Sequence, residues 1–178
     1  RIYGQQDSGS SELSRILVKF PVTGSNSLET DRTNGIIPAS GSVSFYLRMF
    51  NAKHPFTLPR DFNVTIAAIS ASWTEGTGLD MEGYSDSGSA NWNSAFSQSS
   101  GVSYWSAAGG DYHAEPRFTA SFEKGTEDID IDITDLVEQW ISGSLAGGSQ
   151  SGEGIQNGKE NYGIGIFLEN IQRPVRMT

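Results

Sequence analysis

The sequence predicts an all-β protein, an antiparallel β-sandwich of jelly-roll type with one short helix at about residues 134–142. Two observations predict this fold class. Apolar residues recur at every second position in six segments, which is the period of a strand with one buried face. The chain also has 25 serines and 21 glycines among its 178 residues, a composition typical of turns rather than of helical bundles.

Three of the alternating segments lie in the first half of the chain. They cover residues 14–20, 43–49 and 62–68, and clusters of Pro, Gly, Asn and Asp separate them. In the second segment, Tyr46 and Phe50 stand on the face opposite to the apolar series. Each of the three is therefore expected to be a half-buried strand.

The other three segments cover residues 118–122, 129–133 and 162–168. In the middle one, isoleucines alternate with aspartates, which is typical of a strand with one solvent face. In the last one, Gly163 and Gly165 occupy the face opposite to the apolar residues. Glycines at these positions indicate that another part of the chain approaches the strand closely.

One helix is predicted directly after the strand at 129–133. Thr134 is a suitable N-cap residue, and Gly143 is a suitable residue to end the helix. Between them Leu136, Val137, Trp140 and Ile141 form one apolar stripe at helical spacing. A helix of about ten residues depends on such a stripe, because its intrinsic propensity is too small to hold it.

Two regions lack periodicity. Residues 74–115 combine several aromatic residues with Gly, Ser and Asn, and we expect them to fold as an ordered loop region over one end of the sandwich. Residues 142–159 are rich in Gly, Ser and Gln, and we expect a mobile surface loop there.

Length, charge and cysteine content limit the function classes. We expect one β-sandwich domain over residues 1–178, either complete or as a fragment that lacks flanking strands. The net charge of −9 argues against binding to nucleic acid, which needs a positive surface. No apolar run is long enough for membrane insertion. The absence of cysteine excludes disulfides, cysteine zinc sites and thiol catalysis.

The sequence gives little support for catalysis. It has no G-x-S-x-G, HExxH, Walker A or G-x-G-x-x-G motif, and its two histidines, His54 and His113, are too few for a three-histidine zinc site. A triad of a serine with His113 and Asp111 stays open, because triads assemble in space rather than in sequence. We expect a protein that is not an enzyme.

The aromatic residues around 73–112 suggest a glycan-binding site. Aromatic rings stack on the apolar faces of sugars, and Asn, Asp and Glu bind the hydroxyl groups. The alternative, which we favour, is that the tryptophans close the end of a thin core. The residues predicted to bind a glycan are Trp73, Tyr84, Trp92, Trp105 and Tyr112.

A dense run of acids suggests a calcium site. Residues 123–138 contain seven acids in sixteen positions, offset only by Lys124, and like charges at this density cost stability unless they are spread or neutralised. Ca²⁺ prefers hard oxygen ligands of this kind. Solvated aspartates on the outer face of a strand are the alternative explanation, and we favour it. The predicted ligands are Glu75, Asp80, Asp111, Asp128 and Asp130.

Several motifs together resemble the DNRLRE-type β-sandwich domains over roughly residues 12–170. The strongest are the run IDITDLVEQWISG at 131–143 and NYGIGI at 161–166, and the segment SASWTEGTG at 70–78 adds to them. The positions that match are Trp73, Glu75, Gly76, Gly78, Trp92, Trp105, Gly109, Asp111, Thr134, Leu136, Val137, Trp140, Gly143, Asn161 and Gly163.

The resemblance implies a jelly-roll-like module of a secreted or surface protein, with no catalytic residue among the matches. The segments SELSRILVKFP at 11–21 and FYLRMFNA at 45–52 are also similar to virion structural proteins of tailed bacteriophages. This similarity implies a virion location, on the head surface, neck, tail or fibre. The implied partners are other virion proteins, further copies of the same chain as a homo-oligomer, and a glycan of the host surface. The alternative is a carbohydrate-binding module of a secreted or cell-surface bacterial protein.

The chain departs from that family in two ways. A Gly/Ser insertion separates the helix from the last strand, where the family has a short linker. Family members also carry one strand before the first predicted here and another after the last. We expect flanking sequence or a neighbouring subunit to supply these strands, because unpaired strand edges promote aggregation.

Overall fold

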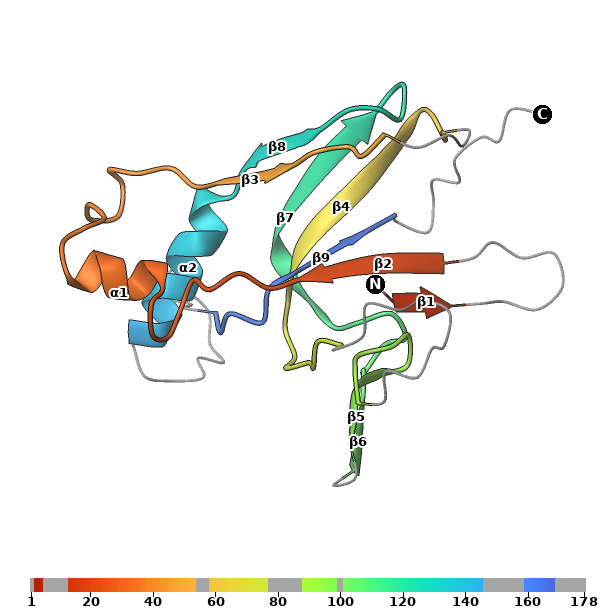
Figure 1. The fold of residues 1–178 in the computed structure, drawn as a ribbon, viewed down its shortest axis with the longest axis horizontal. Helices are drawn as coiled ribbons and strands as arrows, with labels where there is room; N and C mark the ends of the chain where they lie inside the picture. Colours follow the sequence, from red (N-terminus) through yellow and green to blue (C-terminus); the bar gives the residue numbers. More distant parts are fainter. Residues whose placement is uncertain are drawn as a thin grey trace, which may run out of the picture.

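The computed structural model describes residues 2–4, 13–53, 58–76, 88–98, 101–145 and 159–168. These residues form strands and two helices (Figure 1). In chain order the elements are β1 (Ile2–Gly4), β2 (Leu13–Val18), α1 (Leu28–Thr33), β3 (Tyr46–Met49), β4 (Phe62–Ile69), β5 (Ser94–Gln98), β6 (Gly101–Tyr104), β7 (Tyr112–Phe122), β8 (Ile129–Asp132), α2 (Thr134–Leu145) and β9 (Ile164–Phe167).

The strands form three antiparallel sheets. The main sheet has five strands in the order β1-β2-β9-β4-β7, β3 pairs with β8 in a two-stranded ribbon, and β5 pairs with β6 in a hairpin. In Figure 1 the β3–β8 ribbon runs along the top of the main sheet, and the β5–β6 hairpin projects from the bottom of the molecule. These sheets confirm the antiparallel all-β class. The ribbon has only two described strands, so the finer assignment to a jelly-roll sandwich is not confirmed and stays a prediction.

The strand expected before the first predicted one is present in the chain itself. β1 pairs antiparallel with β2, with Ile2 opposite Arg15 and Gly4 opposite Leu13. β1 therefore covers the edge that β2 would otherwise expose.

The main core lies between the five-stranded sheet on one side and α2 with the β3–β8 ribbon on the other. The predicted stripe of α2 is confirmed, because Leu136, Val137, Trp140 and Ile141 are all at most 3% exposed. These side chains pack with buried residues of β4, β8 and β9. Burial of side chains this large contributes about 1.5–3 kcal/mol each, and this packing holds a helix that would be marginal alone.

The two ends of α2 differ from the prediction. Thr134 is the first helical residue rather than the N-cap, and its hydroxyl accepts a hydrogen bond from the Phe45 N–H at 2.8 Å. The Asp132 carboxylate accepts the Thr134 N–H instead, at 2.9 Å. Gly143 does not end the helix, which continues to Leu145. The weak helix propensity of glycine, about 1 kcal/mol below alanine, is smaller than the energy of burying the apolar face.

Helix α1 was not predicted, since its sequence was interpreted as part of a turn cluster. The Ser27 hydroxyl caps it by accepting the Thr30 N–H at 3.3 Å. Arg32 then forms a two-pronged ion pair with Glu138 of α2, and both side chains are largely buried. A helix of six residues needs such a tertiary contact, and its partner lies more than one hundred residues away in the sequence.

Burial along the strands confirms the prediction for β3 and corrects it for β4. Tyr46 is 58% exposed and Phe50 is 76% exposed, as expected for the outer face of the ribbon. β4 was expected to be half-buried, but Thr65, Ala67 and Ile69 on its second face are also at most 7% exposed. The β4 strand lies inside the main sheet, and other parts of the chain cover both of its faces.

The region expected to be a loop over residues 74–115 contains regular structure. Its described part holds the β5–β6 hairpin and the beginning of β7. These strands were missed because Ser, Gly and Asn interrupt the apolar alternation that identifies a strand. Of the loop predicted at 142–159, the first residues are helical, and residues 146–158 lie outside the described residues.

The predicted close approach at Gly163 is confirmed. A Cβ atom there would lie 2.2 Å from the carbonyl oxygen of Val18, and the backbone φ is +87°. Gly41 has nearly the same φ, +86°, but has open space where its Cβ would be. The two positions therefore separate the cost of the backbone conformation from the cost of a steric clash.

We predict that Gly163→Ala lowers the free energy of unfolding by about 3 kcal/mol or more, because strain and a backbone clash add. Gly41→Ala carries the strain alone and should cost about 1 kcal/mol. Urea denaturation of both variants measures the difference. Equal costs at the two positions would show that β2 and β9 do not approach each other as described.

Candidate functional site

The second face of the main sheet carries the candidate site. Ile164 and Ile166 of β9 point into the main core, so Gly165 and Phe167 point to the opposite face. Arg15 lies beside Phe167 in the pairing of β2 with β9. The segment between β6 and β7, residues 105–111, covers this face near the two strands.

Three aromatic rings and one carbonyl group surround the Arg15 guanidinium. Its carbon lies 4.7 Å from the ring centroid of Phe167, 5.2 Å from that of Trp92 and 5.3 Å from that of Tyr112. Its Nη1 donates a hydrogen bond to the Gly109 carbonyl at 2.9 Å. A cation over an aromatic face contributes about 0.5–2 kcal/mol, depending on exposure. Arg15 thereby connects three separate segments of the chain.

Tyr112 lies on the sheet at the position of Gly165. A Cβ atom at Gly165 would come within 2.2 Å of Tyr112 Cε1, so any side chain there would displace the ring. The Tyr112 ring centroid lies 4.7 Å from that of Phe167, and its hydroxyl donates to the Gly109 carbonyl at 2.9 Å. Burial raises the pKa of Tyr112 above its ordinary value despite the nearby Arg15, so the hydroxyl stays a donor at neutral pH.

Hydrogen bonds to its own backbone hold the covering segment in shape. The Asp111 carboxylate accepts the N–H groups of Ser106 and Ala107 at 2.9 and 3.0 Å. The Gly109 N–H donates to the Trp92 carbonyl at 2.7 Å. Trp105 is 6% exposed, and its indole N–H donates to the Asn91 carbonyl at 2.8 Å. The segment therefore has a defined conformation without a ligand.

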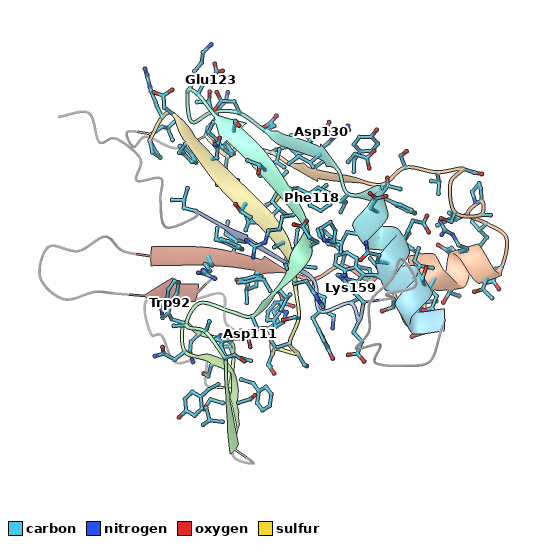
Figure 2. All side chains as sticks on the ribbon, turned by 180° about the vertical axis from the view of Figure 1, so that it is seen from behind. Trp92, Asp111, Phe118, Glu123, Asp130 and Lys159 are labelled. Carbon is cyan, nitrogen blue, oxygen red and sulfur yellow. The ribbon has the colours of Figure 1, made fainter. Side chains whose placement is uncertain are left out.

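An open groove of about 680 Å³ lies between this segment and the sheet. In Figure 2 the labelled residues Trp92 and Asp111 show the end of the molecule at which the groove lies. Two guanidinium groups, one carboxylate and several hydroxyl groups face the groove beside two aromatic rings. The side chains that give it this character are Arg15, Arg117, Asp111, Ser70, Tyr112 and Phe167.

The structure separates the residues predicted to bind a glycan. Trp105 is buried, and Trp73 is half-buried with its indole N–H donating to the Tyr162 carbonyl at 2.6 Å. These two tryptophans pack in a small second core, as in the favoured alternative. Trp92 and Tyr112 meet around Arg15, and Tyr84 lies outside the described residues. Glycan binding itself stays a prediction.

The structure describes four of the acids predicted to bind calcium, Glu75, Asp111, Asp128 and Asp130, and these four do not form a metal-binding group. Asp130 lies near the end of the molecule opposite to Asp111 (Figure 2), and Asp80 lies outside the described residues. In the described ranges no group of three acidic or histidine side chains is placed to hold a metal ion. Asp128 accepts the Asn51 N–H at 2.7 Å, and Asp130 accepts from Arg48 at 2.8 Å. These contacts give Asp128, which directly precedes β8, and Asp130, which lies in β8, a structural use.

The sequence left open a catalytic triad of a serine with His113 and Asp111. In the structure, other contacts determine the environments of His113 and Asp111. The Asp111 carboxylate bonds to backbone N–H groups of its own loop. Burial and the neighbouring Lys159 lower the pKa of His113, whereas an aspartate partner would raise it. Asp111 therefore acts as a loop-fixing group in this structure.

Sequence reasoning missed Arg15, Arg117 and Phe167. Arg15 occupies a polar position in an alternating segment and Arg117 directly precedes another, and a charged residue at such a position is normally assigned to solvent. The one available signal was Gly165, which indicated that something lies close to β9. The neighbour is the Tyr112 side chain, and the groove is built around it.

Comparison of the chain with protein-family models, with curated proteins and with solved structures gives no match. Within the residues that the structure describes, neither helix has the length and apolar character needed to cross a membrane.

We predict that Arg15→Gln lowers the free energy of unfolding by about 1–3 kcal/mol, because several cation–π contacts and one hydrogen bond are lost. Tryptophan fluorescence should also change, since Trp92 loses its stacked cation. Arg48→Gln is the matched control, because Arg48 forms a largely exposed ion pair with Asp130 and should cost less than about 1 kcal/mol. Equal effects in urea denaturation would contradict the assigned role of Arg15.

Proposed function

We propose that this chain is a non-enzymatic structural protein of a bacteriophage virion, in which it joins neighbouring subunits on the head surface, neck, tail or fibre. The observation that carries the proposal is the position of the exposed large apolar side chains. Val102 is 47% exposed and Tyr104 is 72% exposed on the projecting hairpin, and Tyr46 and Phe50 are exposed on the ribbon. Apolar side chains on outward-facing strands are suited to contacts between proteins.

The resemblance of residues 11–21 and 45–52 to virion structural proteins supports the location. The second of these segments includes β3, the strand that carries the exposed Tyr46. The net charge of −9 also suits a particle filled with DNA, since an acidic protein is repelled by nucleic acid.

A carbohydrate-binding module is the second candidate, and the groove favours it. Guanidinium, carboxylate and hydroxyl groups beside the rings of Tyr112 and Phe167 can bind sugar hydroxyls while a ring covers an apolar sugar face. The binding site would then be the Arg15–Arg117 groove rather than a platform of tryptophans. A polysaccharide array probed with wild type and with Arg117→Ala tests this candidate.

We predict that the protein sediments with DNA-filled particles in many copies, as measured by mass spectrometry of purified particle fractions. The double variant V102S/Y104S should reduce the copies per particle, because it removes the exposed apolar surface of the hairpin. Its thermal midpoint should stay close to that of wild type, since both side chains are exposed. Recovery only in a soluble or cell-wall fraction, with binding on the array, would replace the virion proposal with the carbohydrate module.

A further inference from the structure

We propose that the Arg15–Arg117 groove binds the acidic end of a second copy of this chain, so that copies associate head to tail. The acidic end is defined by Glu123, Glu127, Asp128 and Asp130, at the turn between β7 and β8 and along β8. The inference rests on the proposed structural function, which requires repeated copies in contact.

The groove is a positive site in an acidic protein. It is lined by Arg15, which donates to the Gly109 carbonyl, and by the exposed Arg117, whose Nε donates to the Ala114 carbonyl at 3.1 Å. Its one carboxylate, Asp111, accepts two backbone hydrogen bonds, so the two guanidinium groups leave the groove with a net positive charge. A guanidinium binds a carboxylate through two parallel hydrogen bonds, which gives such contacts both strength and direction. A carboxylate-bearing partner is therefore the ligand that the groove favours.

The acidic end offers carboxylates that a partner can reach. Glu123, Asp128 and Asp130 are exposed, and Lys124 is the only base between residues 123 and 138. The ion pair of Asp130 with Arg48 is itself largely exposed, with side chains 49% and 59% accessible. Exposed pairs contribute little, so the Arg117 guanidinium of a second copy can compete for this carboxylate.

The placement of the two surfaces requires two molecules. Glu123 and Asp130 lie at one end of the protein, whereas Trp92 and Asp111 lie at the other end (Figure 2). The acidic end of a chain therefore does not reach its own groove. A contact between two different surfaces of identical copies is heterologous, and it produces a ring or an open row. Either assembly suits a module that repeats on a particle.

A second copy fits the groove better than an acidic polysaccharide does. The acidic end gathers four carboxylates within eight residues, and their mutual repulsion is relieved when a guanidinium site covers them. A neighbouring copy also presents this surface at the high local concentration of a particle.

Sedimentation velocity at about 0.05 M and about 0.5 M salt tests the inference. At low salt the average sedimentation coefficient of the wild type should rise with protein concentration, and at high salt the rise should disappear. Arg117→Glu should weaken association about tenfold, and so should the double variant E123K/D130K. Lys19→Glu makes the same charge change at an exposed residue beside Gly163, outside both the groove and the acidic end, and it should associate like wild type.

Sedimentation velocity of a mixture of the two weakened variants, Arg117→Glu and E123K/D130K, is the decisive experiment. The introduced glutamate of the first variant then faces the introduced lysines of the second, so an equimolar mixture should regain association. This recovery also shows that both variants are folded. A mixture that stays monomeric, or an Arg117→Glu variant that associates like wild type, would overturn the inference.

Two further outcomes separate the inference from the proposed function. A monomeric wild type that still sediments with particles overturns the head-to-tail contact alone. A monomeric wild type that binds polygalacturonate through Arg117 also overturns it, and assigns the groove to an acidic glycan. Self-association of a protein that is missing from particles would instead contradict the virion location.

Discussion

The Tyr112 ring fits against the main sheet only because position 165 has no side chain. This single contact places the Tyr112 hydroxyl and the Arg15 guanidinium on the same carbonyl, that of Gly109. The carbonyl belongs to the segment at 105–111, which covers the second face of the sheet beside Arg15 and Phe167. The groove, the second small core and the projecting hairpin all follow from where that segment is held.

The other face of the sheet depends on ordinary apolar packing. α2 inserts four apolar side chains between the sheet and the ribbon, and Gly163 lets β9 approach the end of β2 within backbone contact. Two different kinds of interaction therefore stabilise the two faces. The face that packs against α2 is stabilised by burial of aliphatic and aromatic side chains, an interaction with little dependence on orientation. The face that carries Tyr112 is stabilised by the Arg15 guanidinium among aromatic rings, an interaction that requires a particular geometry.

Features with a local period could be predicted from the sequence. The stripe of α2 and the alternation of β3 depend only on neighbours a few residues apart, and the structure confirms both. Features that depend on distant partners could not be predicted. Arg15 meets Phe167 through a register between strands about 150 residues apart, and α1 depends on Glu138 in the same way.

The structure brings together only some of the residues predicted to bind a glycan, and the described acids predicted to bind calcium form no group that could hold a metal ion. Sequence spacing gathered residues of the right types, but Trp105 is used in the second core and Asp130 in a cross-strand ion pair. Residue type therefore predicted where aromatic and acidic side chains concentrate. It did not predict which of them the fold would use internally. The groove was found only after the strand register brought Arg15 and Arg117 to one face.

The functions that we propose depend on the surfaces of the molecule. The groove at one end and the acidic residues at the other give the molecule a direction, and the exposed apolar residues lie on its ribbon and hairpin. All of these surfaces depend on a rigid connection between the sheet and the segment at 105–111.

Hydrogen–deuterium exchange of Gly165→Ala tests that connection most directly. Alanine adopts the backbone conformation at 165, so the variant adds one methyl group against Tyr112 without strain in β9. The account predicts at least about tenfold faster exchange at the amides of residues 105–111, with β4 and β9 still protected. Unchanged protection of that segment would contradict the claim that the contact between Tyr112 and Gly165 holds it on the sheet.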